Sequence, residues 1–153
     1  MLEEQKSHSS VQETATQGPF QITDTEVVEI FSTFNVLGHW RNDLETGLVY
    51  CCKTMLDIFG FPPSDGPVSM VDISARLHPD DLTLVMEAHE AASAEPMHFQ
   101  KIHRIQNPSG TYRWYCSAGR FRTKEGTIGE IVGITWEIPP QRCEAIQKRM
   151  NTI

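Results

Sequence analysis

Two short segments of this sequence place a helix start and a tight turn in a set order along the chain. In residues 77–81, Pro79 suits the first turn of a helix, where a missing N–H costs little, and Asp80 and Asp81 complement the positive end of the helix dipole. In residues 107–114, turn residues lie between two stretches of strand composition. The pair therefore predicts a helix followed by an antiparallel hairpin.

The residues after each segment extend this prediction. An apolar stripe at helical spacing follows Pro79 and consists of Leu82, Val85, Met86, His89 and Ala92. Beyond it, residues 97–105, 111–122 and 130–138 have the composition of strands, with turn residues between them. We therefore expect one longer helix and then three consecutive antiparallel strands.

The N-terminal half predicts a capped helix, a hairpin and short helical turns. Thr23 and Glu26 have the spacing of a capping box. An apolar stripe follows them and consists of Val27, Ile30, Phe31 and Phe34. Residues 38–41 and 48–51 flank turn residues and predict a hairpin. Short helical segments are expected at residues 54–59 and 71–77, with residues 62–67 as a loop.

This order of elements predicts an α+β fold. The two early strands and the three late strands can join in one five-stranded antiparallel sheet, with the short helices on one face. The expected organisation is a disordered tail at 1–21, a cap helix at 22–36, the main domain at 37–138 and the start of an exit helix at 139–153.

Charge and composition narrow the classes of function. The sequence has 13 Lys and Arg against 20 Asp and Glu, a net charge of −7, and no basic face suited to nucleic acid or anionic lipid. No apolar run approaches the length of a membrane span, so we expect a cytoplasmic protein with no nucleic-acid or membrane partner. The four cysteines lack CxxC spacing and are expected to be reduced.

Four segments of the sequence resemble one known family. Residues 40–47 resemble the first hairpin of a PAS domain, and residues 77–81 resemble the His-Pro-Asp-Asp segment of the third PAS-fold subfamily. Residues 104–114 resemble the second hairpin of that subfamily, and residues 129–134 its final strand. They are distributed across residues 37–138, and their order makes the resemblance more specific than any one segment does.

The resemblance implies a sensory and dimerisation module of a larger bacterial signal-transduction protein, such as a two-component system. PAS domains hold a small ligand, a cofactor or nothing in a cavity between sheet and helices. They pass a conformational signal to an effector such as a histidine kinase or a cyclic-dinucleotide enzyme. We therefore expect a non-enzymatic domain whose C-terminal effector lies outside this chain, and the ligand must be argued from the residues.

Six residues are candidates for binding a ligand or cofactor: Val85, Met86, His89, Tyr115, Ser117 and Trp136. Tyr115 and Ser117 share one face of their strand, because alternate residues of a strand point the same way. His98 and His103 lie on opposite faces of the preceding strand, so one of them is expected to face the cavity.

His89 has two interpretations. Haem-binding PAS domains of the oxygen-sensor kind place their proximal histidine on the corresponding helix, so the resemblance allows a haem-based gas or redox sensor with His89 as the metal ligand. The alternative is a histidine at the margin of the stripe, bonded to water or a carboxylate. A noncovalent flavin also stays open, whereas no Asn-Cys-Arg segment indicates flavin–cysteine photochemistry. We expect His78 to bond the backbone at the helix start rather than to act in catalysis.

The C-terminal residues Cys143, Ile146, Met150 and Ile153 follow three-four-three spacing. This spacing predicts either a short helix packed on the domain or the first turns of a signalling coiled coil. Together with the stripe Val27, Ile30, Phe31 and Phe34, it predicts a homodimer.

Overall fold

The computed structural model describes residues 19–95, 97–139 and 148–149 of the chain. Most of the predicted tail at 1–21 and most of the predicted exit segment lie outside these residues, including Cys143, Ile146 and Met150. The chain divides into two units, residues 1–35 and 36–153, and each is described by itself.

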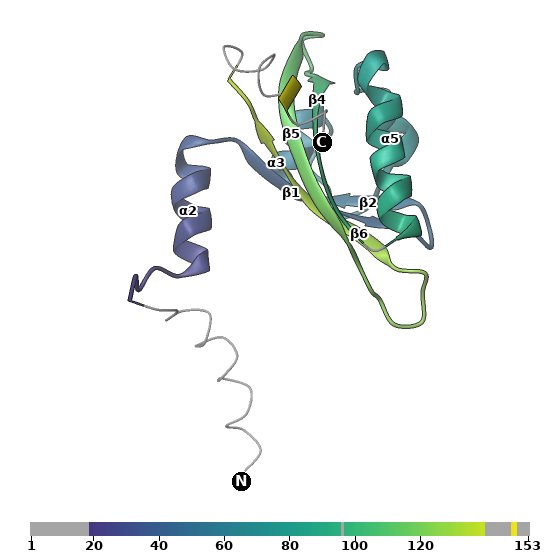
Figure 1. The fold of residues 1–153 in the computed structure, drawn as a ribbon. Helices are drawn as coiled ribbons and strands as arrows, with labels where there is room; N and C mark the ends of the chain where they lie inside the picture. The colour runs from purple at the N-terminus through teal and green to yellow at the C-terminus, as the bar shows by residue number, and fades with distance from the viewer. Residues whose placement is uncertain (1–18, 96, 140–147, 150–153) are drawn as a thin grey trace. The chain divides into compact units, whose positions relative to one another are not determined.

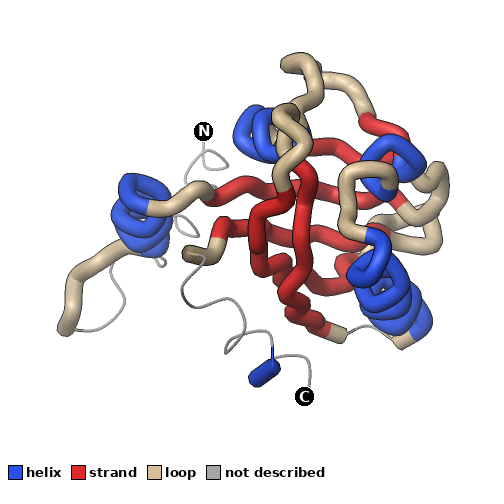
Figure 2. Tube along the Cα trace, turned by 90° about the horizontal axis from the view of Figure 1, so that it is seen from above, coloured by secondary structure: helices blue, strands red, loops and turns tan. Residues whose placement is uncertain are grey.

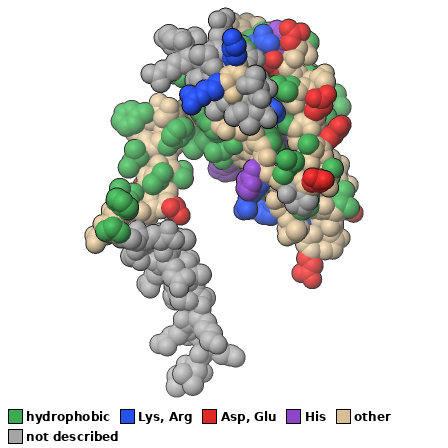
Figure 3. All heavy atoms as spheres, viewed as in Figure 1, with side chains coloured by type: hydrophobic (Ala, Val, Ile, Leu, Met, Phe, Trp, Pro, Cys, Tyr) green, Lys and Arg blue, Asp and Glu red, His purple; other side chains and the backbone are tan. Residues whose placement is uncertain are grey.

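The first unit contains helix α2 (Asp24–Phe34). Its capping box is confirmed: the N–H of Glu26 donates to Thr23 Oγ1 at 3.0 Å, and the N–H of Thr23 donates to Glu26 Oε1 at 3.2 Å. No residue of α2 is buried, and Ile30 and Phe34 are 62% and 85% exposed. Hydrophobic side chains project along the visible face of this helix (Figure 3). The predicted apolar stripe is therefore a surface of α2.

The second unit is built on one antiparallel sheet with strand order β3-β2-β1-β6-β5-β4 (Figures 1 and 2). Its strands are β1 (Leu37–Asp43), β2 (Leu48–Cys51), β3 (Val68–Ser69), β4 (His98–Gln106), β5 (Tyr112–Arg122) and β6 (Glu130–Glu137). The two halves of the chain meet where β1 pairs with β6, as the predicted single sheet requires. This confirms the α+β fold and both predicted hairpins.

The sheet has six strands rather than the five predicted. The additional strand, β3, has only two residues and pairs Val68 and Ser69 with Val49 and Leu48 of β2. Two residues are too few to show an alternating pattern, and the strand follows a segment rich in proline and glycine. Backbone pairing with β2, rather than local composition, therefore creates this strand.

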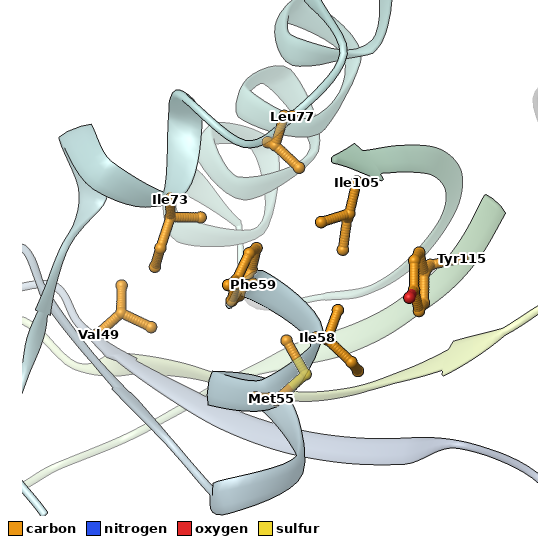
Figure 4. Close-up of a cluster of buried hydrophobic side chains, with 8 residues drawn as sticks. All are labelled: Val49, Met55, Ile58, Phe59, Ile73, Leu77, Ile105 and Tyr115. Carbon is orange, nitrogen blue, oxygen red and sulfur yellow. The ribbon is translucent and has the colours of Figure 1, made fainter. Parts of the chain in front are cut away.

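Three helices of the second unit lie on one side of the sheet: α3 (Lys53–Phe59), α4 (Met70–Ser74) and α5 (Pro79–Ala94). Their contact with the sheet encloses a cluster of buried side chains, shown in Figure 4: Val49, Met55, Ile58, Phe59, Ile73, Leu77, Ile105 and Tyr115. None of the helices that the structure describes combines the length and the apolar character needed to cross a membrane.

Helix α5 is tied to strand β4 by the second aspartate of the opening segment. Asp81 is 3% exposed and accepts three hydrogen bonds from Arg104: from its backbone N–H at 2.7 Å, from Nε at 2.9 Å and from Nη2 at 2.8 Å. Burial alone would raise the pKa of Asp81, but these bonds and the Arg104 charge lower the pKa overall. The Arg104 guanidinium also lies 4.7 Å from the centre of the Trp114 ring.

His78 has the structural position that the sequence predicts. It is the N-cap residue of α5, and its Nδ1 accepts the backbone N–H of Asp80 at 3.1 Å. Its own N–H donates to the carbonyl of Arg104 at 3.1 Å. His78 and Asp81 therefore attach the start of α5 to β4 at two adjacent points.

Replacing Asp81 should destabilise the domain far more than replacing its neighbour. We expect Asp81→Ala to lower the free energy of unfolding by about 3 kcal/mol, because the half-buried Arg104 side chain keeps its charge and loses its buried acceptor. Asp80→Ala is the matched control: its side chain is 79% exposed, and its loss removes a helix-dipole contribution of about 0.5 kcal/mol. Urea unfolding at neutral pH measures both, and equal losses would contradict the assigned role of Asp81.

Candidate functional site

A cavity of about 70 Å³ lies between the sheet and the three helices. Helices supply seven of its lining residues: Met55 and Phe59 from α3, Met70 and Ile73 from α4, and Val85, Met86 and His89 from α5. Most of these side chains are apolar. The polar character of the cavity therefore comes mainly from the sheet and from His89.

One face of the sheet forms the other wall. Its lining residues include Asn42 on β1, Lys101 and His103 on β4, Ser117 on β5 and Thr135 on β6. The strand registers place these residues on the same face, since Lys101 pairs with Ser117 and Ser117 pairs with Thr135. The face that carries His103 is thus the cavity face, and His98 lies on the opposite face.

Four of the six predicted site residues meet at this cavity: Val85, Met86, His89 and Ser117. Tyr115 shares the strand face of Ser117 but packs in the core cluster. Trp136 pairs with Cys116 on the opposite face, one residue along β6 from Thr135. Because adjacent residues of a strand point to opposite faces, Thr135 and not Trp136 faces the cavity. Binding of any ligand by these residues stays a prediction.

The His89 ring is packed against two aromatic rings. Its centre lies 5.4 Å from that of Trp40, in a stacked arrangement, and 5.1 Å from that of Phe99. Two glycines paired across β5 and β6, Gly119 and Gly133, make room for these rings. A Cβ atom at Gly133 would overlap Trp40, and one at Gly119 would lie 2.9 Å from Phe99. The glycine pair is therefore a steric requirement of this wall of the cavity.

A chain of hydrogen bonds crosses four strands along the floor of the cavity. His103 Nε2 lies 2.6 Å from Ser117 Oγ, which lies 2.7 Å from Thr135 Oγ1. Trp40 Nε1 donates to the same Thr135 Oγ1 at 3.0 Å. These side-chain hydrogen bonds thus join β4, β5, β6 and β1 in addition to the backbone pairing of these strands.

Three buried polar atoms of the lining have no hydrogen-bond partner: Asn42 Oδ1, His89 Nδ1 and His103 Nδ1. They are the complete set of such side-chain atoms among the residues that the structure describes. A buried polar atom without a partner costs roughly 1–3 kcal/mol, and most such atoms in native proteins bind water or a ligand. Their presence in one cavity marks it as the candidate binding site.

Burial sets the charge state of this site. It lowers the pKa of His103 to about 4; the nearby His89 acts in the same direction and the Asp81 carboxylate opposes it. Burial likewise lowers the pKa of His89 to about 4. Burial raises the pKa of the Cys51 thiol, another lining residue, to about 11, with Cys52 acting in the same direction. At neutral pH both imidazoles and this thiol are therefore uncharged, and Cys51 is a poor nucleophile.

Sequence reasoning missed Trp40, Asn42 and Thr135, and it left His103 undecided between two faces. Asn42 belongs to the segment 40–47 that resembles a PAS hairpin, but this resemblance does not indicate which of its side chains face the cavity. Thr135 and Trp136 are adjacent on β6, so their side chains point to opposite faces of the sheet. The alternating pattern of the sequence does not show which of these faces the helices cover. A useful signal was present in Gly119 and Gly133, since an interior strand glycine often marks the close approach of another group.

Haem does not fit this cavity in its described conformation. Pockets for drug-sized ligands have volumes of roughly 300–1,000 Å³, and the cavity here is several-fold smaller. The His89 ring is also packed against Trp40 and Phe99. The haem interpretation therefore requires an expansion of the cavity and stays a prediction.

The sequence matches the profile of the PAS fold family over residues 48–135, which covers the sheet from β2 to β6 and the helices that enclose the cavity. The chain belongs to the PAS fold family. PAS domains are regulatory sensor modules rather than catalytic domains, and the resemblance in the sequence is confirmed. No curated protein is similar enough in sequence to count as a match.

Solved PAS structures share this fold at low sequence identity. A sensory box histidine kinase/response regulator from Burkholderia thailandensis is 19% identical with a TM-score of 0.62, over 82% of this chain and 94% of that one. The N-terminal domain of a Marinobacter aquaeolei diguanylate cyclase with a PAS/PAC sensor is 18% identical with a TM-score of 0.60, over 69% and 98%. Drosophila melanogaster Cycle PAS-B with bound ethylene glycol is 19% identical with a TM-score of 0.50, over 64% and 94%.

The buried histidines should make the PAS domain less stable as the pH falls from about 6.5 to about 4. In that window the unfolded chain binds protons on His103 and His89 while the folded domain does not, so protonation favours unfolding. For His103, which is 3% exposed, the free energy of unfolding should fall by up to about 1.4 kcal/mol per pH unit. Urea unfolding at several pH values measures this slope.

His103→Asn should flatten the pH dependence of the free energy of unfolding between pH 6.5 and pH 4. His98→Asn, on the opposite face of the sheet, should leave this dependence unchanged. Equal effects of the two substitutions would show that burial in the cavity does not control the titration of His103.

Proposed function

We propose that this PAS domain is a cytoplasmic sensor in which a small molecule in the cavity alters the signal passed to a C-terminal effector. The observation that carries the proposal is the set of three partnerless buried polar atoms on residues that line one cavity. A purely structural core would fill this space with apolar side chains, because unsatisfied polar atoms lower stability. A bacterial source, a two-component system and the nature of the effector stay predictions.

The strand order offers a route from the cavity to both ends of the domain. Thr135 lines the cavity from β6, and β6 ends at Glu137, just before the exit segment. Strand β6 is paired with β1, which begins at Leu37, three residues after α2 ends at Phe34. A ligand that binds one arrangement of Thr135 and Ser117 better than another would shift the population of β6 conformations. The exit segment and α2 would then respond together.

The names of the similar solved structures support the class of function that we propose. The B. thailandensis and M. aquaeolei proteins are named as a sensory histidine kinase and a diguanylate cyclase sensor, which are effectors of the expected classes. The Cycle PAS-B structure is described with ethylene glycol, a small polar molecule. These names make a small ligand and a signalling effector reasonable for this chain.

Filling the cavity should abolish the response to ligand. Val85 lines the cavity from α5, so Val85→Trp should occupy the space of the ligand. Thr83→Trp, on the exposed side of the same helix, is the control. The small-molecule fraction of a cell extract should raise the melting temperature of the wild type and of Thr83→Trp by a few degrees and leave Val85→Trp unchanged. Equal shifts in all three proteins would refute binding in the cavity.

We also propose that the domain forms a homodimer through α2 and the C-terminal stripe Cys143, Ile146 and Met150. The support is the apolar surface of α2, on which Val27 and Ile30 are 54% and 62% exposed. An apolar helix face of this kind is a common dimer surface in water.

Charge placed on the α2 stripe should weaken this dimer. We expect Ile30→Glu to raise the dissociation constant at least tenfold, because a carboxylate would be desolvated in the contact. Ser32→Glu, on the polar side of α2, should have little effect. Sedimentation velocity over a concentration series measures both. A monomeric wild type at high concentration would contradict the dimer.

A further inference from the structure

We infer that the cavity takes a small, uncharged molecule that carries both a hydrogen-bond acceptor, for His103 Nδ1–H, and a donor, for Asn42 Oδ1. Small amides have this chemistry. The inference rests on the proposed sensor function and deepens it, because it names the class of ligand. It depends on the direction of the hydrogen bonds along the cavity floor.

The direction is set by Trp40, whose indole Nε1–H can only donate. Thr135 Oγ1 accepts this hydrogen at 3.0 Å, so its own hydroxyl proton is available for Ser117 Oγ, 2.7 Å away. Ser117 can then donate to His103 Nε2 at 2.6 Å. In the reverse direction the proton of Thr135 would have no acceptor among the described residues, although Thr135 is only 1% exposed. The forward direction therefore satisfies every hydroxyl in the chain.

This direction determines the tautomer of His103. A neutral imidazole that accepts at Nε2 must carry its proton on Nδ1. His103 Nδ1 is buried without a partner, so this lining residue carries an unsatisfied N–H donor. A carbonyl or hydroxyl oxygen of a ligand is the group that would accept from it.

The donor required of the ligand follows from Asn42. Its Oδ1 is buried without a partner, and the residue is only 6% exposed. A carbonyl oxygen accepts hydrogen bonds and repels an anion, so it selects a ligand N–H or O–H. His89 Nδ1 adds a third partnerless atom to the same cavity. The cavity therefore offers at least one donor and at least one acceptor.

The charge of the lining and the size of the cavity exclude most other classes of ligand. The lining described here contains one charged residue, Lys101, and this side chain also lines a separate groove beside α5. A desolvated carboxylate in the otherwise uncharged cavity would be costly without a buried cation beside it. The volume of about 70 Å³ suits a few water molecules or a ligand of a few heavy atoms.

Three probes of nearly equal size test the inference: acetamide, acetone and acetate. Each is titrated into the ¹⁵N-labelled domain, and the amide resonances of β5 and β6 report binding. We expect acetamide to bind in the millimolar range and about tenfold more tightly than acetone, which lacks the donor. Acetate should bind more weakly than acetamide. Asn42→Leu should remove the preference for acetamide over acetone.

Each contrary result overturns the inference in a recognisable way. Equal binding of acetone and acetamide would show that Asn42 does not select a donor. Tightest binding of acetate would show that Lys101 makes this an anion site. No binding of any probe would show a cavity that holds water only. In the first two cases the proposed sensor function stands. It fails separately if the wild type and Val85→Trp respond alike to the extract.

The tautomer of His103 provides a test that requires no ligand. Imidazole ¹⁵N chemical shifts should show the proton on Nδ1 in the wild type at neutral pH. Trp40→Phe removes the donor that sets the direction of the chain, so the Nδ1–H population should fall. Trp114→Phe, on the opposite face of the sheet, should leave it unchanged. A wild-type proton on Nε2 would overturn the assigned direction and the inference with it.

Discussion

The contact between Asp81 and Arg104 holds the rest of the domain in place around the cavity. It fixes the N-terminal end of α5 against β4 through three hydrogen bonds to one nearly buried carboxylate. Helix α5 supplies Val85, Met86 and His89 to the cavity, so this wall depends on the position at which the contact holds the helix. Because the Asp81 carboxylate accepts all three bonds, its burial leaves no unpaired charge at the start of α5.

The cavity combines features that a stable core would avoid. The chain places a histidine, an asparagine and two hydroxyl residues on the covered face of its sheet, and it leaves three polar atoms without partners. Each such atom lowers stability, which natural proteins commonly tolerate at functional sites. The hydrogen-bond chain from Trp40 to His103 gives this polar surface a direction, because an indole can donate and cannot accept.

The sequence predicted most of the fold because its signals were local. Pro79 and the aspartates after it marked the start of α5, Thr23 and Glu26 marked that of α2, and turn residues marked the hairpins. Strand β3 was missed, since two residues carry no period and only pairing with β2 defines them. At the candidate site, the predicted residues Val85, Met86, His89 and Ser117 line the cavity, whereas Trp136 lies on the opposite face of the sheet, and ligand binding by any of them stays a prediction.

The sequence by itself determined the order of the elements other than β3 and the helix face that meets the sheet, and its resemblance to PAS domains indicated the family. The order and the helix face follow from turn chemistry, capping and hydrophobic period, which act over a few residues. Only the tertiary structure decided which face of the sheet is covered, and so which of two adjacent residues, Thr135 or Trp136, lines the cavity. It also decided that Trp40, Ser117 and His103 form one hydrogen-bond chain with Thr135, because these residues come from four strands that only the folded sheet brings together.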